Sequence, residues 1–199
     1  MFYIFIGLIF IPVLILFPTV IKGKKNIPRK GKMILCCNHQ SNMDLPLIAT
    51  RMRRRYKYLA KKELFNTRFK NWLFRVMGAY PVERGKPDLK AVKNTLNYLK
   101  EEKAVCIFPE GTRLTSDENN EMKGGVAMFA LKTDSPIVPC FIVKKPRPFI
   151  FNKIIIGKPF KFSDFEEFKD KKIDKELIER ATEILSTKIY ELKNYKRRK

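Results

Sequence analysis

The chain has 199 residues, 45% of them hydrophobic, so it can form one well-filled core, and it shows neither an internal repeat nor a second domain. Its 42 lysine and arginine residues outnumber its 20 aspartate and glutamate residues, which gives a formal net charge of +22. A chain this basic is expected to meet an acidic partner, namely nucleic acid, an anionic membrane surface, or phosphorylated and acidic substrates.

The first element is an apolar segment. Residues 1–21 carry no charged side chain, and as a helix they would reach about 31 Å, close to the thickness of the bilayer hydrocarbon. Pro12 and Pro18 interrupt this pattern, and the flanking residues argue against a secretory signal. We expect a spanning or monotopic membrane anchor rather than a buried core helix. Six basic residues between positions 22 and 32 then keep the rest of the chain, one α/β domain over residues 22–199, on the cytoplasmic side.

The next stretch joins a predicted strand to a predicted helix. Met33–Cys37 is apolar and strand-like, the only histidine of the chain, His39, follows it, and Asp44 precedes an apolar helical pattern. A carboxylate at this position can accept the imidazole Nδ1 proton and leave Nε2 free to take a proton from a substrate. Taken alone, the pair fits an ordinary turn histidine better than a catalytic one. Either Ser41 or Asn42 is the expected N-cap of the helix.

Four cysteines, at positions 36, 37, 106 and 140, lie inside apolar strand-like runs. None of them has the spacing of a metal site. We therefore expect buried free thiols in a reducing compartment.

A helix is predicted over residues 63–77, with Gly78 as its C′ residue. Its bulky residues recur at helical spacing and are interleaved with basic ones. The mixture could suggest a nucleic-acid platform, but rings that share one helix face favour packing in the core. The bulky residues are Phe65, Phe69, Trp72, Leu73 and Val76.

The rest of the chain alternates between the two kinds of pattern. Strands are predicted at residues 56–60, 79–83, 104–108, 136–143 and 149–156. Helices are predicted after Asp88, from Gly124 and Gly125, and from Asp174 onward. This alternation predicts an α/β fold with a mostly parallel sheet flanked by helices on both faces.

Three predicted loops follow strands and should therefore gather at the carboxyl ends of the sheet, where such folds bind ligands. The first offers His39 and Asp44, and the second offers Arg84. The third, residues 110–113 (Glu-Gly-Thr-Arg), suits a phosphate, because a guanidinium binds it with two parallel hydrogen bonds and glycine lets backbone amides approach. Taken alone, this third loop fits a turn with a surface salt bridge equally well.

These motifs resemble those of a known family. Residues 38–44 (Asn-His-Gln-Ser-Asn-Met-Asp) resemble the Asn-His-x-Ser-x-x-Asp motif of the glycerolipid acyltransferases, specifically the 1-acyl-sn-glycerol-3-phosphate acyltransferases. Residues 108–113 look like their Phe-Pro-Glu-Gly-Thr-Arg motif, residues 78–84 like the intervening motif that ends in arginine, and residues 60–64 like the lysine segment. Residues 137–139 resemble the last and weakest motif.

The resemblance, which covers roughly residues 23–143, implies a reaction. His39, held by Asp44, would act as general base on the 2-hydroxyl of lysophosphatidic acid. This hydroxyl would attack the thioester of acyl-CoA or acyl-acyl carrier protein and give phosphatidic acid, without a covalent enzyme intermediate, cofactor or metal. The resemblance implies substrate binding by Lys61, Arg84 and Arg113 at the phosphate and by Glu110, Gly111 and Thr112 around the acceptor.

The expected partners are these two substrates and an anionic membrane surface, and no nucleic acid is expected. One alternative is acyl transfer to another acceptor, such as glycerol 3-phosphate or a lysophospholipid. A second is a non-catalytic, basic, membrane-tethered protein that binds lipid or nucleic acid. It explains the charge and the anchor but leaves the ordered motifs without a role.

Overall fold

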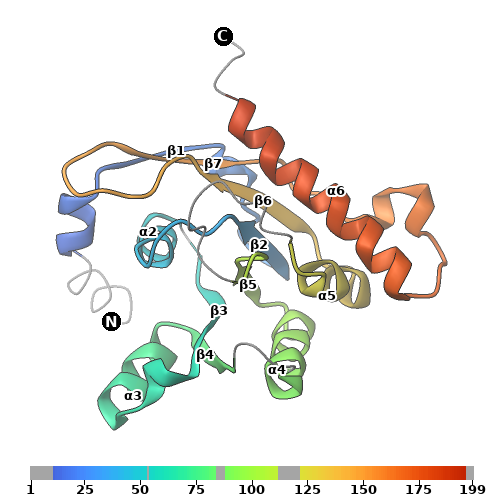
Figure 1. Ribbon diagram of the computed structural model, residues 1–199, viewed down its shortest axis with the longest axis horizontal. Coiled ribbons are helices and arrows are strands. Elements are labelled where there is room, and N and C mark those ends of the chain that lie inside the picture. Colours follow the sequence, from blue (N-terminus) through green and yellow to red (C-terminus); the bar gives the residue numbers. More distant parts are fainter. Residues whose placement is uncertain (1–10, 53, 84–87, 112–121, 196–199) are drawn as a thin grey trace.

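The structure is a computed structural model that describes residues 11–52, 54–83, 88–111 and 122–195. In these ranges a seven-stranded sheet has the order β1-β7-β6-β2-β5-β3-β4, and only the β6–β7 pair is antiparallel (Figure 1). The predicted mostly parallel sheet is therefore confirmed. The strands are β1 (Thr19–Lys22), β2 (Met33–Cys37), β3 (Tyr56–Lys61), β4 (Ala79–Val82), β5 (Ala104–Ile107), β6 (Ile137–Ile142) and β7 (Asn152–Ile156).

Helices cover both faces of the sheet, as predicted (Figure 1). The alternating side chains of β2 divide the core: Met33, Leu35 and Cys37 pack toward α2, and Ile34 and Cys36 pack toward α5 and α6. Helical residues 11–16, α2 and α3 share the first face, and α4, α5 and α6 share the second. The helices are α2 (Asp44–Arg51), α3 (Arg68–Val76), α4 (Leu89–Lys100), α5 (Gly125–Thr133) and α6 (Lys175–Asn194), with 3₁₀ turns η1 (Lys24–Asn26), η2 (Lys62–Phe65), η3 (Phe162–Asp164) and η4 (Glu166–Phe168).

Most predicted helix ends are confirmed by their caps. The Asp88 and Asp174 carboxylates accept hydrogen bonds from the backbone N–H groups of Ala91 and Leu177. Gly78 follows α3 with φ +99°, a backbone conformation that suits only glycine there, because a Cβ would collide with a carbonyl of β3.

The predicted cap of α2 is wrong. Its N-cap is Met43, which makes no side-chain cap hydrogen bond. The hydroxyl of Ser41 accepts a hydrogen bond from the Met43 N–H instead, so Ser41 closes the turn before the helix. Asn42 is not the cap either.

The first described residues of the chain join the sheet and the core. Residues 19–21, which we assigned to the anchor, belong to β1 and pair with β7, and Phe17 is buried in the core. The cause is local, since Pro18 cannot continue a helix and the β-branched residues after it favour a strand. Helical residues 11–16 also contact the core through Val13 and Leu16. Within the described ranges, no helix has the length and apolarity needed to cross a membrane.

The helix predicted over residues 63–77 is divided, and its orientation differs from the prediction. Thr67 caps a new helix by accepting the Lys70 N–H, which separates η2 from α3. The core contacts come from Phe65, Phe74 and Met77. Phe69 and Trp72 are 67% and 51% exposed, so the prediction that these rings pack in the core is wrong.

Strand pairing also corrects the cysteine prediction. The register of β2 and β6 places Cys37 opposite Cys140, and the two form a disulfide. The expectation of free thiols is therefore wrong for this pair, because register between distant strands cannot be seen in the sequence. Cys36 and Cys106 are free and buried, and burial raises the pKa of both thiols.

Candidate active site

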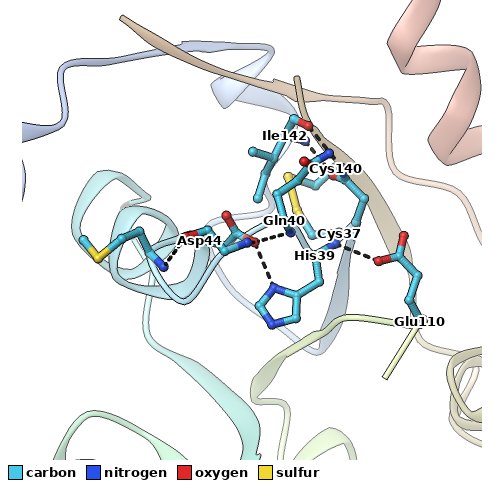
Figure 2. Close-up of polar contacts among 10 residues, drawn as sticks. Cys37, His39, Gln40, Asp44, Glu110, Cys140 and Ile142 are labelled. Atoms are coloured by element: carbon cyan, nitrogen blue, oxygen red, sulfur yellow. Dashed lines mark hydrogen bonds and ion pairs between the residues drawn. A yellow bond between two sulfur atoms is a disulfide. The ribbon is translucent and has the colours of Figure 1, made fainter. Parts of the chain in front are cut away.

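The centre of the site is the pair predicted from the sequence. His39 follows the carboxyl end of β2, Asp44 is the first residue of α2, and His39 Nδ1 lies 2.8 Å from Asp44 Oδ2 (Figure 2). A carboxylate oxygen only accepts, so Nδ1 donates the hydrogen bond and the lone pair resides on Nε2. Asp44 is completely buried and His39 is 9% exposed. A substrate would therefore meet a base that is largely shielded from water.

Asp44 organises the whole loop between β2 and α2. Its Oδ2 also accepts the backbone N–H groups of Gln40, at 2.6 Å, and Ser41, at 2.7 Å. Its place in the first helical turn puts negative charge at the positive end of the helix dipole. These bonds fix the carboxylate, and the carboxylate in turn fixes the plane of the His39 ring. Within the described residues, Asp44 Oδ1 has no hydrogen-bond partner.

Asn38 secures the end of the strand just before His39. Its side-chain amide donates to the Ile142 carbonyl at 3.1 Å and its Oδ1 accepts the Ile142 N–H at 2.7 Å. These two bonds tie the carboxyl end of β2 to that of β6. Because Asn38 is completely buried, losing them would leave polar groups without partners in the core.

Glu110 connects the third loop to the first. It follows β5, is 3% exposed, and accepts the His39 backbone N–H through Oε2 at 2.9 Å. Its Oε1 accepts the Tyr190 hydroxyl from α6 at 3.4 Å. Burial raises the pKa of the Glu110 carboxyl, and the His39 amide partly opposes this rise. Phe108 stacks on the His39 ring, with centroids 4.2 Å apart and planes at 22°.

The remaining described residues of the predicted site are Gly111 and Lys61. Gly111 has φ +69°, and a Cβ on it would lie 3.1 Å from the Lys123 ammonium, so glycine makes room for a cation beside this loop. Lys61 ends β3, at the same sheet edge as His39, because β3, β5 and β2 are parallel. Its side chain is about half exposed, and its ammonium lies 3.5 Å from the Glu63 carboxylate.

Three predicted site residues, Arg84, Thr112 and Arg113, lie outside the described residues. The described ones, His39, Asp44, Glu110, Gly111 and Lys61, all follow or end parallel strands at one sheet edge.

Sequence reasoning assigned no role to three residues that complete the site. Asn38 and Phe108 stand inside quoted motifs, which was a signal that each has a function, but their partners depend on strand register and on ring orientation. Tyr190 lies 80 residues from Glu110 on the last helix, and nothing in its surrounding sequence sets it apart from a core residue.

Comparisons with known proteins point in one direction. The profile of the family described as Acyltransferase matches residues 19–143. A 1-acyl-sn-glycerol-3-phosphate acyltransferase of Bacillus subtilis is 30% identical over 182 residues, which is 86% of each chain. One of Streptococcus pneumoniae is 31% identical over 130 residues, 61% of this chain and 47% of that protein.

A solved structure agrees with the sequence matches. The crystal structure of the 1-acyl-sn-glycerophosphate acyltransferase PlsC from Thermotoga maritima aligns with a TM-score of 0.72 and 25% identity. The alignment covers all of this chain and 79% of that one. Its similarity therefore extends over the sheet, both helix layers and the residues around His39.

Proposed function

The chain belongs to the acyltransferase family, and from this we propose that it transfers a fatty acyl group to the 2-hydroxyl of 1-acyl-sn-glycerol 3-phosphate, giving phosphatidic acid. Relatives named 1-acyl-sn-glycerol-3-phosphate acyltransferases and the structural similarity to PlsC support the proposal. The observation that carries the chemistry is the 2.8 Å bond that leaves Nε2 of His39 as the base.

The proposed reaction is a direct transfer. His39 Nε2 takes the proton of the acceptor hydroxyl while the hydroxyl oxygen attacks the thioester carbonyl. The carbon–oxygen bond of the new ester forms, the carbon–sulfur bond breaks, and the departing thiolate takes the proton from His39. Asp44 stabilises the imidazolium that exists between these events, and a thiolate leaves readily enough that no acyl-enzyme is required.

We assign the phosphate of the acceptor to Lys61, Arg84 and Arg113, with Gly111 and Thr112 shaping the loop around it. Guanidinium groups match a phosphate monoester with paired hydrogen bonds, and an exposed lysine at the end of β3 adds positive charge. Glu110 is assigned a supporting role, since both of its oxygens accept bonds from protein groups, the His39 amide and the Tyr190 hydroxyl.

The acyl donor is proposed to be acyl-CoA or acyl-acyl carrier protein. Both are acidic, and a protein with a net charge of +22 attracts either one and an anionic membrane surface. We place the chain at a membrane with its catalytic domain on the cytoplasmic side, because basic residues follow the apolar N-terminal segment.

One assay tests this function. Purified protein is supplied with a long-chain acyl thioester of either donor and, separately, with lysophosphatidic acid, glycerol 3-phosphate and lysophosphatidylcholine, and both thiol release and the lipid product are measured. We expect phosphatidic acid from lysophosphatidic acid and little product from the other two. Preferential acylation of glycerol 3-phosphate or lysophosphatidylcholine would assign the chain to another acceptor.

A further inference from the structure

Two exposed apolar protrusions flank the active site. The first, the β6–β7 tip, comprises residues 144–151, and the second, the η2–α3 segment, comprises residues 62–76. Neither takes part in the chemistry described above. Each combines large exposed apolar side chains with exposed cations, and the pairing of these two features points to a ligand.

The β6–β7 tip presents three consecutive apolar side chains to solvent. Phe149, Ile150 and Phe151 are 78%, 54% and 79% exposed. We predicted that they begin a strand, but β7 starts only at Asn152. Three adjacent apolar residues held outside the fold are unfavourable in water unless something covers them.

The tip is held in place by buried Asn152 rather than left loose. The Asn152 amide donates to the Ile150 carbonyl at 3.0 Å, and its Oδ1 accepts the Arg147 N–H at 3.1 Å. The Phe149 N–H donates to the Leu16 carbonyl at 2.6 Å, which joins the tip to helical residues 11–16. These hydrogen bonds therefore hold the backbone of the tip in place.

The η2–α3 segment has two apolar sides. One packs on the core through Phe65 and Phe74. The other exposes Phe69 and Trp72, whose ring centroids lie 6.2 Å apart. The core contacts fix the helix, so its second apolar side is presented to solvent by a rigid element.

Positive charge surrounds both protrusions. The tip contains three exposed cations and no acidic residue, and the η2–α3 segment contains four exposed cations and one acidic residue, Glu63. These cations are Lys144, Lys145 and Arg147 in the tip and Lys62, Arg68, Lys70 and Arg75 in the segment.

The sheet places the active site between the protrusions. The tip follows the carboxyl end of β6, the segment follows that of β3, and β2, which leads to His39, lies between β6 and β3 in the parallel part of the sheet. The tip, helical residues 11–16 and α3 all lie toward the left in Figure 1. Ile11 and Ile15 of that helical stretch are exposed as well.

We propose that the β6–β7 tip and the η2–α3 segment form one surface that docks on an anionic lipid bilayer and turns the His39 loop toward the headgroups. Apolar side chains would enter the headgroup–acyl boundary while the cations meet lipid phosphates. This docking rests on the proposed function, because it would bring the catalytic domain to its lipid acceptor. The binding itself requires no turnover.

A bilayer fits this surface better than other partners of a basic protein. Nucleic-acid bases stack on aromatic rings but do not stack on aliphatic side chains. This surface also exposes the aliphatic side chains of Ile150 and Leu64. A second copy of this chain also carries a net charge of +22 and would be repelled. Lipid accepts aromatic and aliphatic side chains alike and supplies the opposite charge.

Trp72 allows a direct test because it is the only tryptophan of the chain. Full-length protein is titrated with vesicles of phosphatidylcholine alone or with phosphatidylglycerol added, and Trp72 emission is recorded. We expect a blue shift with the anionic vesicles, and quenching when the acyl chains are brominated near the headgroup. Unchanged emission from protein that sediments with the vesicles would overturn the proposal for the η2–α3 segment.

The tip is tested by replacing Phe149, Ile150 and Phe151 together with serine. We expect binding to anionic vesicles to weaken by about tenfold or more, because one to two apolar side chains would no longer be buried in the bilayer. Leu89→Ser is the matched control, since Leu89 is 81% exposed but begins α4 on the other face of the sheet. Equal vesicle binding by the triple variant and this control would overturn the proposal, provided that both show wild-type thermal unfolding.

Two further measurements distinguish a bilayer from other partners and distinguish docking from catalysis. A Trp72 response to duplex or single-stranded oligonucleotide but not to vesicles, or a lipid-free dimer that the triple variant abolishes, would replace the bilayer with nucleic acid or a second copy. With lysophosphatidic acid in detergent, the triple variant should keep wild-type turnover. Vesicle binding by wild-type protein that acylates no acceptor would refute the proposed function and leave this inference standing.

Discussion

The β2–α2 junction and the η2–α3 segment both combine apolar and polar residues at close spacing, but the fold uses them in opposite ways. At the junction, Asn38, His39 and Asp44 are buried and joined by short hydrogen bonds to backbone and side chains. In the η2–α3 segment, Phe69 and Trp72 are turned outward among cations. Buried polar groups joined by hydrogen bonds and large apolar groups left in solvent are both unusual, so the first marks a candidate site for chemistry and the second a candidate site for docking.

His39→Ala would separate the two regions most strongly. Acyl transfer should fall by about 10²–10⁴-fold, because a general base is removed and the chain contains no second histidine. Vesicle binding and thermal unfolding should remain close to wild type. Turnover of lysophosphatidic acid with an acyl thioester measures the first, and sedimentation and circular dichroism measure the others. Normal turnover by folded protein would remove His39 from the mechanism.

Asp44→Asn should also act at the junction. The asparagine side chain retains an acceptor for the Gln40 and Ser41 amides, but it neither stabilises the imidazolium nor fixes which His39 nitrogen carries the proton. We expect a loss of about 10²-fold or more in kcat with a small change in KM for the acceptor. If kcat is retained and only thermal stability falls, Asp44 serves the loop rather than the base.

Arg113→Lys tests the phosphate assignment and should have an intermediate effect. Lysine keeps the charge but loses the paired planar bonds, so the loss of one charge-assisted bond predicts about a ten- to hundred-fold decrease. This decrease should appear with lysophosphatidic acid and be absent from the slow hydrolysis of the thioester by water, which needs His39 alone. Equal losses with lysophosphatidic acid, lysophosphatidylcholine and water would place Arg113 in the fold or the donor site.

Glu110→Gln should have the smallest effect and a distinct dependence on pH. Burial raises the pKa of Glu110, so between the ordinary glutamate pKa and the raised one the unfolded chain loses its proton first. Wild-type stability therefore declines as pH rises through this window.

The glutamine variant lacks this decline and keeps an acceptor for the His39 amide, so its melting temperature relative to wild type should increase from pH 4 to pH 7. Thermal unfolding across that range measures the difference. A relative melting temperature that decreases with pH would show that the carboxylate is stabilised in the fold.

Much of the junction could be predicted because its signals are local. The apolar run of β2, the histidine after it and the aspartate in the first turn of α2 are neighbours in the sequence, and the motif fixes their spacing. The Asn38–Ile142 bonds and the Cys37–Cys140 disulfide could not be predicted, because both depend on how β2 pairs with a strand about 100 residues later.

The wrong predictions for α3 and for β1 have a different physical origin. Helical spacing shows that Phe69 and Trp72 share a face, but spacing alone does not show whether that face meets the core. Likewise, an unbroken apolar run concealed β1, an edge strand whose residues are alternately half-buried and exposed, since apolar β-branched residues occur both in membrane anchors and in strands. Only the position of each segment relative to the sheet and the core distinguishes these cases.

We propose that His39, oriented by Asp44, activates the acceptor for direct attack, and a single-turnover experiment distinguishes this mechanism from one with an acyl-enzyme. Enzyme in excess is mixed with acyl thioester and lysophosphatidic acid and quenched at intervals, and free thiol, phosphatidic acid and intact protein mass are measured in wild type and His39→Ala. We predict that thiol and phosphatidic acid appear together in the wild type, with no acylated protein, and that neither appears at a comparable rate in the variant. An acyl group that appears on a cysteine or on Ser41 and is consumed as fast as phosphatidic acid forms would contradict the account.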